Sequence, residues 1–118
     1  MEQEHRPWGF FRILADGEGH RIKRIVVHAG GRMSLQRHRL RDEHWYVISG
    51  EGRVTLGERL ISLKQGESVD IPRNELHRVE NGGTADLVLI EIQTGGYFGE
   101  DDIERLSDDY GHCEGYGD

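Results

Sequence analysis

The stretch SLQRHRLRDEHW, residues 34–45, places Gln36, His38 and Glu43 together in a segment otherwise rich in arginine. Gln36 and His38 are two residues apart, so on a β-strand their side chains project from the same face. Glu43 follows five residues later, which lets the chain turn and bring a carboxylate back toward the pair from the adjoining strand. The stretch therefore predicts two strands that direct three donor groups toward one point.

A second segment, GESVDIPRNELHRVEN at 66–81, adds a fourth donor. Its glycine turn, short strand, Pro72 and second turn deliver His77 at the start of the following strand. Two imidazole nitrogens, one carboxylate and one amide oxygen suit a divalent cation and leave room for water or substrate. Each residue alone would more often be an ordinary surface or hydrogen-bonded side chain, but the joint arrangement predicts a metal site. Its expected ligands are Gln36, His38, Glu43 and His77.

The chain around these segments is typical of short strands separated by tight turns, with 17 glycines but only two prolines in 118 residues. Nine apolar or alternating runs lie between about residues 10 and 93, at the spacing of a small antiparallel barrel or sandwich. They are FFRIL, HRIKRIVV, RMSLQRH, HWYVISG, GRVTLG, RLISLKQG, SVDIP, LHRVENGG and ADLVLIEIQTGG.

A helix is expected only in EDDIERLSDDY, residues 100–110, where early acidic residues favour a helix N-terminus. The sequence thus predicts one all-β domain over residues 1–118. Its barrel covers about 10–94, and a short helical or irregular tail covers 95–118.

The net charge of −7 is located in that tail. Residues 95–118 contain eight acids and the single base Arg105, whereas residues 1–94 contain fourteen of each sign. A neutral body with an acidic tail argues against nucleic acid or an anionic membrane as partner. The N-terminus has no apolar run typical of a signal peptide or membrane span, and Cys113 is the only cysteine. These features favour a protein of the reducing cytoplasm.

Two motifs in register resemble those of the cupins. Gly30, Gln36, His38, Glu43 and Gly50 occupy the places of the first motif, with glutamine where the first histidine usually stands. The second motif is matched by Gly66, Pro72, His77 and Asn81. Asn74 replaces its inner glycine, a mild change because both residues tolerate a left-handed backbone. The resemblance implies the cupin fold, a double-stranded β-helix or jelly-roll barrel.

Four segments further resemble the type II phosphomannose isomerase domain. They are RPWG at 6–9, KRIVVHAGGRMSLQRHRLRDEHWYVISG at 23–50, IPRNELHRVEN at 71–81 and LIEIQTGGYFGEDDIERLSDDYG at 89–111. The resemblance implies metal-dependent interconversion of mannose 6-phosphate and fructose 6-phosphate through an enediol. It also implies one divalent ion, zinc first, with manganese, cobalt, nickel, iron and magnesium as alternatives.

In that family the domain often follows a mannose-1-phosphate guanylyltransferase domain, for which 118 residues leave no room, so we expect a stand-alone isomerase or a relative of one. Family likeness and the tendency of small barrels to pair through an exposed edge strand predict a homodimer.

The isomerisation requires a base and an anion clamp in addition to a Lewis acid. Glu91 and Gln93 share one face of the last strand, and Glu91 would lie near the metal if that face lines the barrel; Lys23 and His44 are alternatives. A strand glutamate paired with an arginine is the competing interpretation of Glu91. The expected catalytic residues are Arg105, Glu91 and Lys23, and the expected substrate or phosphate ligands are Arg41, Arg78 and Gln93.

Arg105 enters this set through the resemblance, which implies that the tail closes over the barrel mouth and contributes its arginine. An ion pair with Asp101 or Asp102 in a tail helix is the alternative. Two other functions remain open. Two histidines and a carboxylate also suit a non-haem metal oxygenase, and the same site without turnover would make a sugar-phosphate-binding module.

Overall fold

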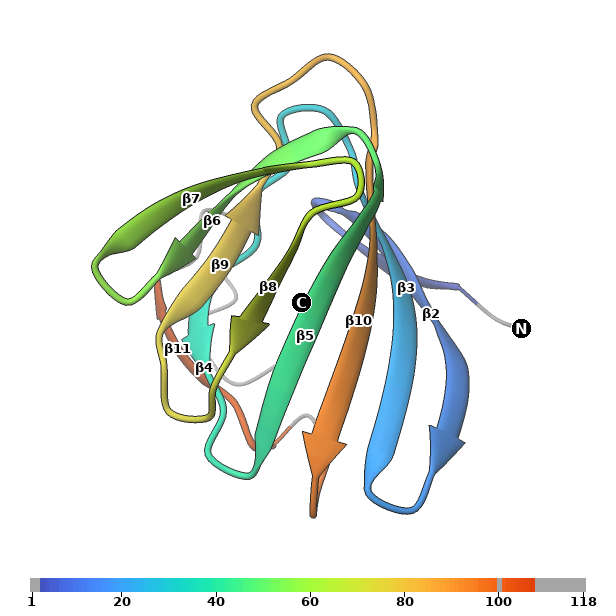
Figure 1. The fold of residues 1–118 in the computed structure, drawn as a ribbon, viewed down its shortest axis with the longest axis vertical. Helices are drawn as coiled ribbons and strands as arrows, with labels where there is room; N and C mark the ends of the chain where they lie inside the picture. The colour runs from blue at the N-terminus through green and yellow to red at the C-terminus, as the bar shows by residue number, and fades with distance from the viewer. Residues whose placement is uncertain (1–2, 100, 108–118) are drawn as a thin grey trace.

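The structure is a computed structural model that describes residues 3–99 and 101–107, and its ribbon forms two antiparallel sheets folded into a barrel (Figure 1). The described residues form strands, turns and loops, without a helix. Consequently, this part of the chain holds no helix of the length and hydropathy that crossing a membrane requires. The expected all-β fold is confirmed.

Each sheet combines strands that are distant in sequence, as a double-stranded β-helix requires. Sheet A has the order β1 (Glu4–Arg6), β2 (Gly9–Gly17), β3 (His20–Val27), β10 (Leu87–Gly95), β5 (Arg41–Ser49) and β8 (Ser68–Ile71). Sheet B has the order β11 (Glu104–Ser107), β4 (Leu35–Arg37), β9 (His77–Glu80), β6 (Glu51–Leu56) and β7 (Arg59–Lys64).

The core lies between the sheets because alternate residues of each strand point inward. The buried apolar side chains form one cluster. Its members are Trp8, Phe11, Ile25, Val27, Met33, Trp45, Val47, Val54, Leu56, Leu63, Ile71, Val79, Leu87 and Leu89.

The chain passes from sheet A to sheet B at Gly50, between β5 and β6. Its φ of 80° lies in the left-handed region, and a Cβ there would come within 2.4 Å of the Asp86 carbonyl oxygen. Only glycine fits such a backbone at so close an approach. This position of the first motif is therefore a crossover between the sheets.

Asn81, the last residue of the second motif, has a structural role. It is buried, and its amide nitrogen donates to the carbonyls of Val27 and Ala85 at 2.9 and 2.8 Å. Its side-chain oxygen accepts from the Gly83 N–H at 3.0 Å. The residue thus joins the end of β3 to the loop before β10.

The prediction of a helix at 100–110 is wrong for the described residues 101–107. That segment contains β11, which pairs antiparallel with β4 and places Arg105 opposite Gln36. Pairing with an edge strand satisfies its backbone groups and overrides the helical preference of the preceding acids. The part at 108–110 lies outside the described residues. The barrel consequently extends beyond residue 94, because both the end of β10 and all of β11 belong to its sheets.

Candidate metal centre

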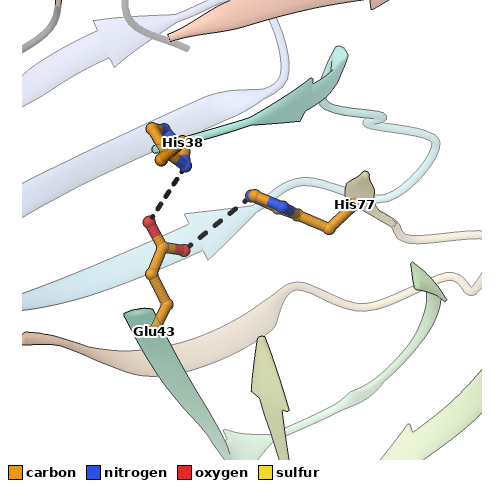
Figure 2. Close-up of side chains that lie close together, drawn as sticks. All are labelled: His38, Glu43 and His77. Atoms are coloured by element: carbon orange, nitrogen blue, oxygen red, sulfur yellow. Dashed lines mark ion pairs between the residues drawn. The ribbon is translucent and has the colours of Figure 1, made fainter. Parts of the chain in front are cut away.

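Three of the four expected ligands meet inside the barrel. His38, Glu43 and His77 are all buried, and one donor atom of each lies within 4.8 Å of the others. The Glu43 carboxylate lies between the two imidazoles, with Oε2 3.6 Å from His38 Nδ1 and Oε1 3.9 Å from His77 Nε2 (Figure 2). The predicted grouping of these three residues is therefore present in the fold.

Glu43 reaches the histidines from the opposite sheet, not from an adjoining strand. β5 belongs to sheet A, whereas β4 and β9, which hold or precede the histidines, belong to sheet B. Gln36 of β4 is paired directly with His77 of β9. The expectation of a simple two-strand unit was wrong because the loop after His38 crosses between the sheets. The site accordingly lies between the two layers.

His77 is oriented by its own loop. Its Nδ1 lies 3.0 Å from the carbonyl oxygen of Glu75, which can only accept a hydrogen bond. Nδ1 therefore carries a proton, which leaves Nε2, the nitrogen that faces Glu43, as the atom that can bind a metal. The Trp45 ring packs edge-on against the His77 imidazole, with 5.6 Å between the ring centroids, and limits its rotation. This is the tautomer that a metal ion at Nε2 requires.

Glu43 is ionised although it is buried. Burial by itself would raise the pKa of its carboxyl group, but His77 and Arg41 outweigh this and hold the pKa below its ordinary value. Arg41 Nε donates to Oε2 at 2.8 Å, and Trp45 Nε1 donates to Oε1 at 3.0 Å. The carboxylate is thus a fixed negative charge at the centre of the site.

His38 is neutral in this environment. Burial, followed by the charges of Arg41 and His77, lowers the pKa of its imidazole to about 2. Arg41 Nη2 lies 2.8 Å from His38 Nε2 and can only donate, so Nε2 is the acceptor nitrogen. A metal ion bound at Nε2 would take the lone pair that Arg41 uses here. Metal binding at that atom and this Arg41 contact therefore exclude each other.

Gln36 is the fourth expected ligand and lines the same cavity. Its amide nitrogen is turned toward the carbonyl oxygen and Oγ of Ser34, at 3.4 and 3.3 Å. The amide oxygen consequently faces the other way. The same Ser34 Oγ accepts from Arg105 Nε at 3.2 Å. Arg105 is thus buried beside Gln36 through β11.

Backbone contacts fix the loop after β4 from two directions. The Asn74 N–H donates to the His38 carbonyl at 2.6 Å, and Asn74 has a φ of 71°, which fits its place in the glycine position of the motif. The buried Asp102 carboxylate accepts from the backbone N–H groups of Arg39 and Leu40 at 3.1 and 2.9 Å. Asp102 was missed by the sequence reasoning because this contact joins residues more than sixty positions apart.

A second buried carboxylate, Glu91, lines the cavity beside Glu43. Burial and the neighbouring Glu43 charge raise the pKa of Glu91 to about 7. Lys23 is its direct neighbour on β3, and Gln93 Nε2 donates to its Oε1 at 2.9 Å. The structure therefore places Glu91, Lys23 and Gln93 together next to the metal ligands.

Two arginines converge on one carbonyl at the mouth of the barrel. Arg41 Nη1 and Arg21 Nη1 donate to the Phe98 carbonyl at 3.4 and 3.5 Å, and the Arg21 guanidinium lies 5.8 Å from the Phe98 ring centroid. Sequence reasoning missed Arg21. Strand alternation predicts that Arg21 lies on the inward face of β3, but it does not predict a contact with a residue 77 positions away.

Two other candidates lie elsewhere. Arg78 follows His77 on β9, so its side chain projects from the opposite face of sheet B, and it does not line the cavity. His44 projects from the outer face of β5 and contacts Asp70 Oδ1 through Nδ1 at 2.6 Å. Arg78 and His44 therefore project from the outer faces of their strands, away from the candidate metal ligands.

The donor set fits a divalent cation. His38 and His77 provide two nitrogens, the ionised Glu43 provides one oxygen, and the Gln36 oxygen is available to complete the set. The adjoining cavity of about 40 Å³ has room for roughly three water molecules.

Fold and site together define a cupin, and solved structures agree. A double-stranded β-helix protein from Klebsiella pneumoniae superposes with a TM-score of 0.76 at 17% identity, covering 89% of this chain and 90% of that one. Oxalate decarboxylase from Bacillus subtilis, described with Mn(II) centres, gives a TM-score of 0.79 at 25% identity over 90% of this chain and 30% of its own.

The chain belongs to the family described as "Mannose-6-phosphate isomerase C-terminal", whose model matches residues 1–108. Xanthan biosynthesis protein XanB of Xanthomonas campestris is 46% identical over 107 residues, and alginate biosynthesis protein AlgA of Pseudomonas aeruginosa is 45% identical over 107. A mannose-1-phosphate guanylyltransferase of Salmonella muenchen is 43% identical over 109. The matches cover 91%, 91% and 92% of this chain but only 23%, 22% and 23% of those relatives.

Proposed function

We propose that this domain is a metal-dependent aldose-ketose isomerase that interconverts mannose 6-phosphate and fructose 6-phosphate. The observation that supports this most directly is the pairing of two different carboxylates in one buried cavity. Glu43 is ionised between two histidines, and Glu91 beside it has a pKa of about 7. The first suits a metal ligand and the second a proton carrier, which are the two groups that the reaction requires.

The proton transfer is assigned to Glu91. A divalent cation, when bound, would supply Lewis acidity toward the C1 and C2 oxygens of the open-chain sugar. Glu91, as the carboxylate, takes the proton from C2 of the aldose and returns it to C1 of the resulting enediol, while the proton of the C2 hydroxyl passes to the C1 oxygen, so the carboxylate is regenerated. Gln93 holds one oxygen of Glu91 in place, and Lys23 adds positive charge beside it.

The phosphate is assigned to the mouth of the barrel. The cavity of about 40 Å³ holds waters but not a hexose phosphate, so Arg41 and the Phe98 segment must move when substrate enters. Arg41 and Arg21 already direct guanidinium groups toward the Phe98 carbonyl, and a phosphate in its place would be a stronger acceptor for both. Arg105 is assigned to positioning Gln36 through Ser34, and Arg78 is left without an assigned role in binding.

Metal and setting are proposed on chemical grounds. Two imidazoles, a carboxylate and an amide suit zinc, with manganese, cobalt, nickel, iron and magnesium to be compared by reconstitution. We place the activity in the cytoplasm, in the sugar-phosphate supply of polysaccharide synthesis, because the relatives XanB and AlgA are described as xanthan and alginate biosynthesis proteins.

The test is conversion of mannose 6-phosphate to fructose 6-phosphate by the metal-reconstituted protein. His38→Ala and Glu43→Ala should each abolish turnover and metal binding. His44→Ala is the matched control, since it removes a histidine from the outer face of the strand that holds Glu43. Absence of turnover with every candidate metal, in protein that binds metal, would refute the isomerase and leave a sugar-phosphate-binding module or a metal oxygenase.

A second candidate is a metal oxygenase, which the arrangement of two histidines and one carboxylate favours. Oxygen consumption by the iron-loaded protein, with the same three variants, separates this activity from isomerisation. The isomerase predicts turnover of the sugar phosphate without oxygen uptake.

A further inference from the structure

Arg41 contacts two of the candidate metal ligands with a single guanidinium group. Its Nε donates to Glu43 Oε2 at 2.8 Å, and its Nη2 lies 2.8 Å from His38 Nε2. The third nitrogen, Nη1, donates to the Phe98 carbonyl at the mouth of the barrel, at 3.4 Å. The Arg41 side chain is only 6% exposed, so these contacts are shielded from solvent. Arg41 therefore joins the ligand cluster to the mouth.

The two shorter contacts use atoms that a bound cation would also use. Oε2 is the oxygen of Glu43 that faces His38, at 3.6 Å from its Nδ1. Nε2 of His38 has one lone pair, and Arg41 occupies it. A guanidinium group and a divalent cation also repel each other, most strongly where burial lowers the effective dielectric constant. Arg41 accordingly competes with a metal ion for one set of ligand atoms.

The backbone at Arg41 is fixed, so only its side chain is free to change place. The N–H of the preceding Leu40 donates to the buried Asp102 carboxylate at 2.9 Å. On the other side Gly95 of β10 pairs with Arg41, and a Cβ at Gly95 would come within 2.4 Å of the Leu40 carbonyl oxygen. The long side chain can still turn about its staggered torsions while this backbone stays in place.

The mouth offers the guanidinium group a second place to bind. Arg21 Nη1 donates to the same Phe98 carbonyl at 3.5 Å, so two guanidinium groups already share one neutral acceptor. A phosphate group at that point would accept from both of them, in charge-assisted bonds that are stronger than those to a carbonyl. Arg41 can thus exchange its charged contacts to Glu43 and His38 for charged contacts to an anion.

We propose that Arg41 couples binding of the metal ion to binding of the substrate phosphate. The inference rests on the proposed function, because it takes the anion at the mouth to be the phosphate of the sugar. In one position the guanidinium group occupies Glu43 Oε2 and His38 Nε2, and in the other it holds the phosphate and leaves both atoms to the cation. Phosphate must then raise metal affinity, and metal must raise phosphate affinity by the same factor.

The first test measures Zn(II) affinity of the full chain by competition with a chelating dye, without a phosphate ester. Arg41→Met should bind Zn(II) about 10- to 100-fold more tightly than the wild type, since one or two charged hydrogen bonds no longer oppose ligation. Arg21→Met is the matched control, because it removes the same charge from the mouth without freeing a ligand atom. It should change the affinity by less than about fivefold.

Circular dichroism checks that both variants fold. An unchanged or weaker Zn(II) affinity in folded Arg41→Met would overturn the proposal. Equal tightening in Arg41→Met and Arg21→Met would also overturn it, because a general effect of charge would then account for the result.

The second test uses the wild type, so it does not depend on the folding of a variant. The probe is methyl phosphate, which has no hydroxyl group on its carbon that could reach the metal ligands. Saturating methyl phosphate should raise the Zn(II) affinity by about 5- to 150-fold, the usual range of a coupling free energy. Zn(II) should raise the affinity for methyl phosphate, measured by isothermal titration, by the same factor. Failure of the wild type to bind methyl phosphate, or a factor of about one, would overturn the proposal.

Arg41→Met, where it folds, should lose this coupling, and it also corrects for any Zn(II) that the ester itself binds. Both tests measure binding and not turnover, so they separate the coupling from the isomerase. Coupling in a protein that does not convert mannose 6-phosphate would keep the role of Arg41 and refute the isomerase. Turnover in a protein without coupling would do the reverse.

Discussion

The interior of the barrel has a polar end and an apolar end, and the same strands supply both. β3 contributes Lys23 to the polar end but Ile25 and Val27 to the apolar end, and β10 contributes Glu91 and Leu89 in the same way. Residues two apart on one inward face thus differ in whether they line the polar cavity or fill the apolar core. Strand alternation decides which side chains point inward, and the position along the strand decides what they are for.

The polar end is predicted to contain the largest functional effect. Glu91→Gln keeps the shape of the side chain but removes the proton carrier, so kcat should fall by about 10²–10⁴-fold. Metal affinity, measured by isothermal titration, should change little because Glu91 is not a ligand. Turnover that survives in Glu91→Gln would move the base to Lys23, and Lys23→Met then becomes the informative variant.

The apolar end should affect stability alone. Leu89→Ala removes a fully packed side chain two residues from Glu91 and should lower the free energy of unfolding by about 2–5 kcal/mol. Leu60→Ala, at an exposed position, should change it by less than about 0.5 kcal/mol. Urea unfolding measures both, and kcat per folded molecule should stay at the wild-type value. A large loss of kcat in Leu89→Ala would contradict the division of the interior.

The metal-free protein should show a pH dependence that originates in the polar end. The folded chain holds a proton on Glu91 up to a pKa of about 7, whereas the unfolded chain releases it near 4.5. The folded state therefore binds more protons between these values, and its stability should fall as pH rises from about 4.5 to 7, by up to about 3 kcal/mol. Unfolding of the chelated protein at several pH values tests this, and Glu91→Gln should remove the dependence.

The mouth of the barrel should give the smallest effect. Arg21→Gln should raise KM for mannose 6-phosphate by about 10-fold with little change in kcat, since it removes one charged hydrogen bond to the phosphate. Arg24→Gln is the control, because it removes the same charge from the outer face of the same strand. Equal effects of both variants on KM would indicate a general electrostatic contribution instead of a specific contact.

The two ends also differ in how far the sequence alone defines them. The barrel and the grouping of His38, Glu43 and His77 were predictable because alternation and motif spacing are local: His38 and His77 follow from their own turns. The arrangement at the mouth was not predictable, because Arg21 and Arg41 contact Phe98 across 77 and 57 positions of sequence, and no short segment predicts such a contact. From the sequence alone, Arg78 and Arg21 are equally plausible phosphate ligands. Only the structure shows that Arg21 projects toward the mouth of the barrel and Arg78 projects away from the cavity.

The tail shows a different limit. Acids at 100–104 favour a helix start, yet the exposed edge of β4 offers hydrogen-bonding groups that a strand satisfies better. Local preference is a matter of tenths of a kcal/mol per residue, and tertiary pairing readily exceeds it. The existence of β11 was therefore unpredictable from its own sequence.

The pairing of β11 with β4 also bears on the order in which the site can be assembled during synthesis. Gln36 and His38 leave the ribosome about sixty-five residues before Asp102 and Arg105, which fix the loop after β4 and the neighbouring Ser34. Contacts of such high sequence separation close late, because the chain entropy of the intervening loop opposes them. The nascent barrel can therefore begin to collapse around its apolar end while the ligand loop is still without its restraints. Metal capture should accordingly follow the pairing of β11 with β4.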